Sequence, residues 1–496
     1  MQCSTLKVPL DYTNTESSEK LDIAVYRVEA AVPVEQRKGS IIFNCGGPGS
    51  PCGPDLGAYA QRMQAATGGY HDLITFDPRG TKGSPIRFMC YDDPVSLAAA
   101  PPFIAGYSHE FALGQDWSAS IVLSEDCAKK QNETGSLIGT AFVARDMMQI
   151  VDALKEDGLL RFWGVSYGTL LGATTVAMFP DRVDKIILDG VVNPFEYYHN
   201  QEIELFSDAD AAFSGFCRES LYGLLDILKA FPIPNPNRHL PNQVPEWTYT
   251  SVKGNIYSRL YFPQTWPALA KEIEAIITTI LTDDSTRSRW PELAKKLNAF
   301  IDILKAEGTF SSEQARGLYS RADNQTEIIK AALPDHSLAG IKCSDMFIDG
   351  ASLHNMLPTL KARMQKSRIG GDASIQVPMT CANWKFKAKE RYSGDFKVKT
   401  KTPVLVIGNT YDPVTPLVSA KNVSETLEGV LLHQDSYGHD SLPQASLCTA
   451  KAIRAYFLRG ELPQVGTKCS TEVQLFGKND GWEDVIKQLQ IEPLSP

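Results

Sequence analysis

Short β-rich runs alternate with helix-like segments through the first part of the chain. Apolar residues recur at helical spacing in Phe142–Leu154 and Gly168–Phe179, which predicts two helices. The runs that predict strands are Asp22–Ala31, Ser40–Asn44, Leu73–Phe76, Phe162–Val165 and Lys185–Leu188. Strands that alternate with helices are typical of a mostly parallel sheet with helices on both faces, so we expect an α/β fold.

The pattern changes near Pro194 and returns only after about Cys381. Between them, strand signals are sparse, which predicts a large, mainly helical cap inserted into the core. The clearest amphipathic stretches are Leu221–Phe231, Trp266–Leu281 and Trp290–Leu304. After the insertion, Pro403–Ile407 and Gly429–Leu432 are predicted strands and Gln444–Leu458 a predicted helix. The expected division is a core at residues 1–194 and 386–496, with the cap at 195–385.

Composition and charge narrow the classes of function. The 496 residues are 43% apolar and 22% charged, an ordinary balance for a globular protein. The net charge is −9 and no long run of Lys or Arg occurs, so the chain lacks the basic surface that nucleic-acid binding requires. No run of 18 or more apolar residues occurs, so we expect no membrane-spanning helix. The oligomeric state is not predicted.

Ten cysteines bear on the compartment. None forms a C-x-x-C pair, so we expect no zinc ribbon and predict no metal site. An even, scattered set suits disulfides in an oxidising compartment, with buried free thiols as the alternative. N-x-S/T sequons at Asn132, Asn324 and Asn422 also favour secretion and predict a glycoprotein. No signal peptide is visible, so a cytoplasmic enzyme is the alternative if Met1 is the native start.

Gly164-Val165-Ser166-Tyr167-Gly168 matches the G-x-S-x-G motif of a nucleophilic serine. A buried strand precedes it and a helix of small and apolar residues follows. Such a sharp turn lifts the serine hydroxyl above the sheet, and glycines at both ends relieve crowding. An ordinary turn is the alternative, because the motif also arises by chance. We predict that Ser166 is the nucleophile of a serine hydrolase with an α/β-hydrolase fold.

The Gly-rich segment Asn44-Cys45-Gly46-Gly47-Pro48-Gly49 follows a predicted strand. Backbone N–H groups in such a loop can stabilise the negative charge of a tetrahedral intermediate. We assign one N–H donor of this oxyanion hole to Gly47 and the second to Tyr167, the residue after the nucleophile. A purely structural loop is the alternative. Asp77 and Arg79 are expected to brace this region through a salt bridge rather than to catalyse.

A serine hydroxyl needs a nearby base, and in this fold serine, acid and histidine follow in that order, each after a strand. His439 fits as the base, whereas His433 lies at or near a strand end and is expected to be structural. Asp412 is the one carboxylate in the loop after Pro403–Ile407, so we predict that it orients His439. Asp435 and Asp440 lie too close in sequence to His439 and are expected to be solvated turn residues.

With these residues in place, the chain resembles the tripeptidyl aminopeptidase-like branch of the proline iminopeptidase (peptidase S33) family. The resemblance spans nearly the whole chain and is weakest in the cap. It implies a cofactor-free hydrolase that cuts amides or esters near a free N-terminus. The matching stretches are Cys3–Tyr12 (CSTLKVPLDY), Gly46–Ser50 (GGPGS), Phe76–Ser84 (FDPRGTKGS), Trp163–Gly172 (WGVSYGTLLG), Phe179–Asn193 (FPDRVDKIILDGVVN), Ile407–Pro416 (IGNTYDPVTP), Gly438–His439 and Cys448–Cys469.

The resemblance also implies three disulfides. They are Cys90–Cys127, Cys343–Cys381 and Cys448–Cys469. Two features depart from the family pattern. Cys45 and Cys52 flank the oxyanion loop and are either bridged to each other or free thiols. Cys217 stands where the family has one partner of a cap disulfide, but no second cysteine occurs at 218–227, which puts the substrate pocket of the cap in doubt.

An aminopeptidase needs an anion that holds the α-ammonium group of its substrate. In the related enzymes, such acids come from the cap. The carboxylates of the early cap segment are Glu196, Glu202, Glu204, Asp208 and Asp210, and the last four are the candidates we assign to substrate binding. A solvated helix face is the alternative explanation for each.

Three functions remain open. The first is an exopeptidase that releases short N-terminal peptides or residues. The second is a hydrolase of an ester, thioester or lactone of a small metabolite, since acyl transfer is common to both. The third is a catalytically inactive binding protein, which the complete set of Ser166, Asp412 and His439 disfavours.

Overall fold

The computed structural model describes residues 1–216, 220–235, 238–239, 244–282, 291, 295, 335–346, 352–476 and 479–491. Three features of the sequence lie outside these residues. They are Cys217, the sequon at Asn324 and, apart from two residues, the helix expected at Trp290–Leu304.

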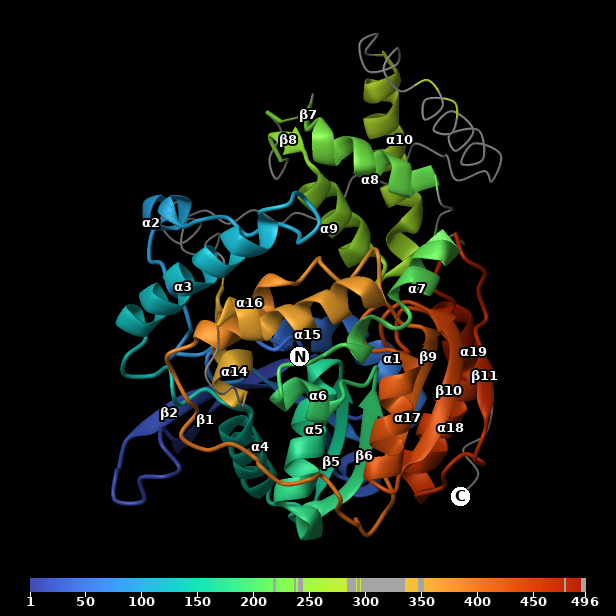
Figure 1. Cartoon of the computed structure of the whole chain (residues 1–496). Helices are drawn as coiled ribbons and strands as arrows, with labels where there is room; N and C mark the ends of the chain where they lie inside the picture. Colours follow the sequence, from blue (N-terminus) through green and yellow to red (C-terminus); the bar gives the residue numbers. More distant parts are fainter. Residues whose placement is uncertain are drawn as a thin grey trace.

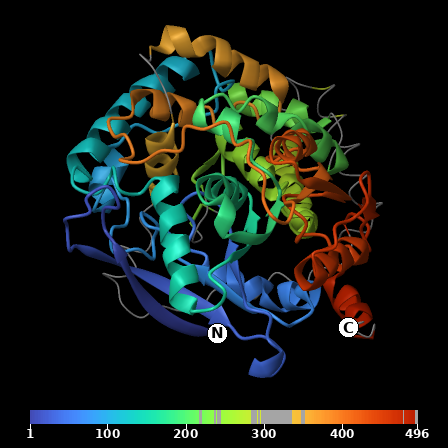
Figure 2. The same cartoon turned by 90° about the horizontal axis from the view of Figure 1, so that it is seen from below.

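One mostly parallel sheet organises the molecule (Figure 1). Its spatial order is β1-β2-β4-β3-β5-β6-β9-β10-β11, and only the β1–β2 and β2–β4 pairs are antiparallel. Seen from below, the sheet runs from the blue N-terminal strands to the red C-terminal elements (Figure 2). The strands are β1 Gln2–Pro9, β2 Lys20–Val28, β3 Ser40–Asn44, β4 Asp72–Phe76, β5 Leu160–Val165, β6 Val183–Asp189, β9 Leu405–Tyr411, β10 Val430–Tyr437 and β11 Lys468–Ser470.

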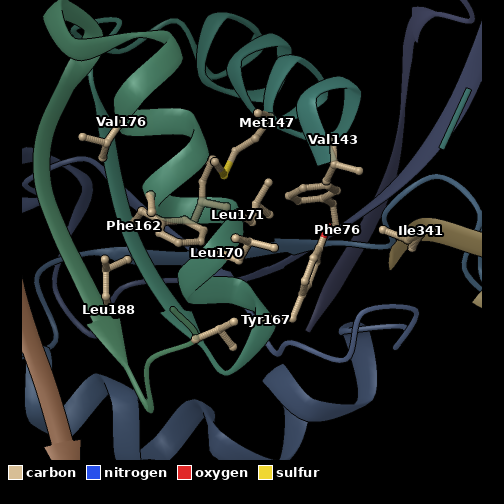
Figure 3. Close-up of a cluster of buried hydrophobic side chains, with 14 of the residues drawn as sticks. Phe76, Val143, Met147, Phe162, Tyr167, Leu170, Leu171, Val176, Leu188 and Ile341 are labelled. Carbon is tan, nitrogen blue, oxygen red and sulfur yellow. The ribbon is translucent and has the colours of Figure 1, made fainter. Parts of the chain in front are cut away.

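Helices cover both faces of the sheet, because successive residues of each buried strand point to opposite sides. Phe162 of β5 packs with α4 (Thr140–Leu154), α5 (Tyr167–Met178) and α17 (Leu417–Thr426). Figure 3 shows part of this cluster, in which Phe76, Phe162 and Leu188 meet Val143, Met147, Leu170, Leu171 and Val176. The next residue of β5, Trp163, packs on the other face with α1 (Gly53–Thr67), α18 (Leu447–Arg459) and α19 (Trp482–Ile491). The α/β-hydrolase arrangement expected from the sequence is therefore present.

Between β6 and β9 the described chain is mainly helical and has its own apolar core around Phe213, Ile256, Trp266 and Ile273. Helices α8, α9 and α10 stand above the sheet (Figure 1). The elements of this segment are α6 Pro194–Tyr198, η3 Glu204–Phe206, α7 Ala209–Phe216, α8 Ser220–Ala230, β7 Ile233–Pro234, β8 Glu246–Trp247, α9 Tyr249–Arg259, η4 Pro263–Thr265, α10 Trp266–Thr282, α14 Ser337–Asp345, α15 Leu353–Lys366 and α16 Gln376–Asn383. We propose that residues 195–385 form the cap and that 1–194 and 386–496 form the two parts of the core.

The cap segment also contacts a helix that precedes the nucleophile. In α3 (Ala112–Lys130), the Ser124 hydroxyl donates to the carbonyl of Thr380 in α16 at 3.4 Å, and the Thr380 hydroxyl donates to Ser120 at 3.3 Å. Three short elements complete the first part of the chain. They are η1 Val34–Gln36, α2 Pro94–Ala99 and η2 Pro180–Arg182.

Two expectations about local structure were wrong. Strand β10 continues to Tyr437 instead of ending at Leu432, because its pairing with β9 extends past residue 434. Arg79 does not pair with Asp77. Its guanidinium is fully buried and binds both carboxylate oxygens of Asp146 in α4 at 2.6 Å, while Asp77 accepts a hydrogen bond from Tyr26 at 2.9 Å. A fully buried arginine requires a buried anion that matches its planar fork, and α4 supplies it.

The described residues contain four disulfides, and Cys3 is an exposed free thiol. The three pairs implied by the resemblance are bridged, and Cys45 is bridged to Cys52. Four disulfides are typical of proteins that fold in an oxidising compartment.

Removal of the bridge between α18 and β11 should destabilise the protein. In a Cys448→Ala/Cys469→Ala variant, we expect the free energy of unfolding to fall by about 3 kcal/mol, because the unfolded chain loses a closed loop. The two cysteines are 21 residues apart. Urea unfolding under non-reducing conditions measures the change. Cys3→Ala is the matched control and should leave the transition in place; an equal shift in both variants contradicts the expectation.

Candidate active site

Ser166 forms the whole turn between β5, which ends at Val165, and α5, which begins at Tyr167. Its backbone has φ 57° and ψ −126°, a strained conformation for a residue with a side chain. The N–H of Ser166 donates to the carbonyl of Asp189 at 3.1 Å, and its own carbonyl accepts from the N–H and hydroxyl of Thr169 at 2.8 and 2.6 Å. The neighbouring strand and the first turn of the helix therefore hold the serine in place.

The two glycines of the motif permit this turn. A β-carbon on Gly164 would lie 2.3 Å from the carbonyl oxygen of Gly168, and one on Gly168 would lie 2.6 Å from the carbonyl oxygen of Asn44. Both distances are too short for a side chain. The motif thus reflects close backbone packing of β5, α5 and the end of β3 around Ser166.

The predicted oxyanion loop follows β3 and lies against the serine. A β-carbon on Gly46 would lie 2.7 Å from Cβ of Ser166 and 3.3 Å from the backbone nitrogen of Tyr167. The disulfide between Cys45 and Cys52 closes this loop, and the N–H of Cys45 also contacts Sγ of Cys52 at 3.0 Å. The structure therefore brings the loop that carries Gly47 beside the first residue of α5, which has an N–H group with no acceptor inside the helix.

His439 and Asp412 come together after β10 and β9. Nδ1 of His439 lies 3.1 and 3.2 Å from the two carboxylate oxygens of Asp412, and the Thr415 hydroxyl lies 2.9 Å from the same nitrogen. Asp412 is completely buried and accepts from the backbone N–H groups of Val414, Thr415 and Asp440 at 2.8 to 3.0 Å. This arrangement directs Nδ1–H toward the acid and leaves Nε2 for proton transfer.

The electrostatics of the pair match that use. Burial alone would lower the pKa of His439, but the charge and hydrogen bond of Asp412 raise it above its ordinary value. Burial alone would raise the pKa of Asp412, but His439 and the surrounding N–H donors hold it below its ordinary value. Nε2 of His439 is buried and has no hydrogen-bond partner within the described residues. The hydrogen bond between Nε2 and the Ser166 hydroxyl is therefore not formed in this structure. Such catalytic contacts often tighten only when substrate binds.

A residue of the cap segment covers the base. The N–H of His439 donates to the carbonyl of Tyr261 at 2.9 Å, and the two rings meet edge to face with centroids 5.0 Å apart. Sequence reasoning did not single out Tyr261, Thr415 or Asp189. Asp189 had one local signal, a carboxylate at the end of a buried strand.

The other acids and the second histidine lie elsewhere. His433 is within β10, where Nε2 lies 2.7 Å from the Thr410 hydroxyl. Asp435 is also a residue of β10 and pairs with Lys468 at 3.0 Å, so the expectation that it is a solvated turn residue was wrong. Asp440 is not a solvated turn residue, as expected from the sequence, but is buried. Burial and the nearby Asp189 raise its pKa well above the ordinary value.

The structure surrounds two of the cap carboxylates with partners. Glu202 is buried and accepts from Nζ of Lys342 at 2.6 Å and from Nη1 of Arg363 at 3.3 Å. Its charge is therefore compensated. Glu204 accepts from three side chains. These are Asn193 at 2.7 Å, Ser419 at 2.8 Å and Asn422 at 2.9 Å.

The remaining cap carboxylates differ in how they are satisfied. Asp210 accepts from the Ser367 hydroxyl and from two backbone N–H groups at 2.7 to 3.0 Å. Asp208 accepts from the N–H of Leu417 at 3.1 Å, and burial raises its pKa. Glu196 accepts from the N–H of Glu204 at 3.0 Å, and burial raises its pKa to about 7. Among the described residues, Glu202 is the one of these five acids with an ion-pair partner within 4.0 Å, and Glu196 and Asp208 each accept a single hydrogen bond.

A mostly parallel sheet between two helical layers, with the serine on the turn after its central strand β5, defines the α/β-hydrolases, and this protein is a hydrolase of that class. A family model described as alpha/beta hydrolase fold matches residues 40–218, and one described as TAP-like protein matches residues 367–469. The second match and the relatives below make the chain similar to the tripeptidyl aminopeptidase-like branch of this superfamily.

Three curated relatives are similar over nearly the whole chain. The tripeptidyl aminopeptidase of Streptomyces lividans is 24% identical over 95% of this chain and 84% of that protein. The serine protease Hip1 of Mycobacterium tuberculosis is 24% identical over 94% of this chain and 87% of that protein. The carboxylesterase B of Mycobacterium tuberculosis is 25% identical over 95% of this chain and 86% of that protein. These names support a serine hydrolase that acts on peptides or esters.

None of the helices in the described part of the chain is long and apolar enough to cross a membrane. Among the same residues, no group of three or more His, Cys, Asp or Glu side chains gathers in a metal-binding arrangement.

The acid limb of the pH profile should report the His439–Asp412 pair. Activity requires neutral His439, so kcat/KM should fall as the pH drops through a pKa above that of an ordinary histidine. Asp412→Asn removes the charge that raises this pKa, so the midpoint should move to lower pH while kcat falls roughly 10⁴-fold. Steady-state kinetics between pH 5 and pH 9 measure both changes, and an unmoved midpoint argues against the pairing.

The disulfide of the oxyanion loop should matter for turnover more than for folding. In a Cys45→Ala/Cys52→Ala variant, we expect kcat to fall by up to roughly 10²-fold, because the N–H donor of Gly47 is no longer held in place. Cys90→Ala/Cys127→Ala is the control, since that bridge joins the segment before α2 to α3. Equal kcat losses in the two variants are the contrary result.

Proposed function

We propose that the enzyme is an aminopeptidase that releases short N-terminal peptides or residues through an acyl-enzyme. The observation that carries this proposal is the buried His439–Asp412 pair together with two cap carboxylates, Glu196 and Asp208, whose pKa burial raises and which each accept a single hydrogen bond and no ion pair among the described residues. The tripeptidyl aminopeptidase among the relatives supports the same conclusion.

In the proposed reaction, Nε2 of His439 takes the proton of the Ser166 hydroxyl while Oγ attacks the scissile carbonyl carbon. The N–H groups of Gly47 and Tyr167 hold the oxyanion. His439 then gives its proton to the leaving amine, and the acyl-enzyme remains on Ser166. Water, deprotonated by His439, attacks the ester carbonyl and releases the acyl product, which restores the serine hydroxyl.

Glu196 is the acid we propose for the α-ammonium group of the substrate. It lies in α6, directly after β6 and near the carboxyl end of the sheet. Burial raises its pKa to about 7, and the charges of Glu204 and Glu202 add to the effect, while the backbone N–H of Glu204 and the charge of Arg363 oppose it. A substrate ammonium would relieve this cost by supplying the missing cation. Asp208 is the second such acid, since it accepts from the N–H of Leu417 at 3.1 Å in the chain that follows Asp412.

The second candidate function is hydrolysis of an ester, thioester or lactone of a small metabolite. The relative named carboxylesterase B favours it. In that case, Glu196 has no role in binding, and the same serine, histidine and acid perform the acyl transfer.

We further propose that the protein is secreted or matures in the secretory pathway. Four disulfides support this proposal. Glycosylation stays a prediction. Asn132 is exposed, whereas the side chain of Asn422 donates to Glu204 at 2.9 Å and is partly buried.

A comparison of substrates tests the proposed function. Chromogenic tripeptidyl and prolyl amides with free N-termini, their N-acetylated twins and short-chain aryl esters are offered to wild type, Ser166→Ala and Glu196→Gln. Wild type should cleave free amides and not acetylated ones. Ser166→Ala should be inactive and folded. Glu196→Gln should raise KM for free amides roughly 10- to 100-fold and leave ester turnover unchanged, because one buried ion pair with substrate is lost.

Glu425→Gln, an exposed change on α17, is the control for Glu196→Gln. Ester turnover without amide turnover would establish the second candidate function. Labelling by a fluorophosphonate addresses the third possibility, since a catalytically inactive binding protein would not react at Ser166. Near-native turnover by Ser166→Ala would refute the assignment of the nucleophile.

A further inference from the structure

Asp189 is a completely buried carboxylate that the proposed reaction does not use. It is the last residue of β6, the strand beside β5. Its backbone carbonyl accepts the N–H of Ser166 at 3.1 Å. Its carboxylate accepts the N–H of Ser441 at 3.0 Å, the Ser441 hydroxyl at 2.5 Å and Nε1 of Trp163 at 3.3 Å. One residue therefore binds both the nucleophile turn and the segment after His439.

The loop that carries His439 is held from two sides. On one side, Asp412 binds the imidazole and the N–H of Asp440. On the other side, Asp189 binds Ser441, two residues after the histidine. The chain also packs tightly there, because a β-carbon on Gly190 would lie 3.0 Å from Cβ of Asp440. Asn409 and Gln434 hold carbonyl groups of the same loop, whereas Asp189 is the acceptor for both the N–H and the hydroxyl of Ser441.

Burial of the Asp189 carboxylate is unfavourable for its charged form. Burial raises the pKa of Asp189 to about 6, although the hydrogen bonds of Ser441 and Trp163 oppose that shift. No lysine or arginine pairs with it within the described residues. When the pKa of a carboxyl group is higher in the folded state than in the unfolded state, the free energy of unfolding of the protein falls as the pH rises from the unfolded-state pKa to the folded-state pKa. At neutral pH, the negative charge of Asp189 therefore costs stability, which points to a use other than folding.

We propose that Asp189 is a positioning residue that sets the approach of His439 to Ser166, its backbone holding the serine turn and its carboxylate holding the histidine loop. This inference rests on the proposed roles of Ser166 and His439. It holds equally for a peptide or an ester substrate. Asp189 touches neither the substrate nor the transferred proton; it acts through Ser441 and the backbone of Ser166.

Three variants and one control test the proposal by aryl-ester or amide kinetics. Asp189→Ala should lower kcat about 10²-fold with KM within a factor of about three, because a displacement of the base of roughly 1 Å has that effect on turnover. Asp189→Asn keeps one acceptor for the N–H of Ser441 and should rescue part of the loss. Ser441→Ala removes only the hydroxyl donor and should lower kcat several-fold. The rate of inactivation by a fluorophosphonate should also fall most in Asp189→Ala and less in Asp189→Asn and Ser441→Ala.

Asp184→Asn is the matched control, because Asp184 lies at the other end of β6 and pairs there with Arg161 and Lys185 at 2.9 and 3.0 Å. It should leave kcat unchanged. A thermal melt at pH 7.5 separates positioning from folding. Asp189→Asn should melt no lower than wild type if the carboxylate serves catalysis, whereas a purely structural carboxylate would give a lower melting temperature and an unchanged kcat.

Wild-type kcat in Asp189→Asn and Ser441→Ala, or a loss confined to KM, would overturn the inference even if Asp189→Ala does not fold. Failure of the proposed function gives a different result. If Ser166→Ala keeps its turnover, the nucleophile is wrong. If Ser166→Ala is inactive and the Asp189 and Ser441 variants are fully active, only the positioning role fails.

Discussion

The strained backbone of Ser166 is the feature on which the rest of the site depends. A residue with a side chain in this conformation costs of order 1–3 kcal/mol, so the surroundings must hold it there. The N–H of Ser166 donates to a carbonyl of β6, and its own carbonyl accepts from the first turn of α5. Gly164 and Gly168 leave room for the turn because they have no β-carbon. Because β5 lies between β3 and β6, the same packing places the oxyanion loop on one side of the serine and Asp189 on the other.

The pKa of His439 depends on the buried carboxyl groups that the same packing brings near it. Three buried carboxylates, those of Asp412, Asp440 and Asp189, raise the pKa of the imidazole against the effect of burial. Asp412 has the hydrogen bonds that keep it ionised, whereas burial raises the pKa of Asp440 and Asp189. The three buried carboxyl groups thus differ in pKa because they accept hydrogen bonds from different donor groups. Proximity alone does not decide which one orients the base.

Sequence reasoning located what is encoded locally. The strand, turn and helix around Ser166 and the loop that carries Asp412 are contiguous stretches, so their pattern and glycines could be recognised, and the structure brings Asp412 and His439 together. Partners chosen across the fold could not be predicted. Arg79 binds Asp146 of α4 because both are buried at the same place, and nothing in the local sequence excludes Asp77. The burial of Asp440 has the same origin.

The cap shows why substrate specificity is harder to infer than the chemistry. All five early carboxylates are equivalent in sequence, yet Lys342 and Arg363 from later helices neutralise Glu202, and three side chains satisfy Glu204. Glu196 and Asp208 differ from the other three because each accepts a single hydrogen bond among the described residues and has no cation beside it, which only the folded structure can show. A negative charge kept in a partly buried place without a partner is destabilising unless something else supplies the positive charge. A substrate with a free amine is the simplest source of that charge.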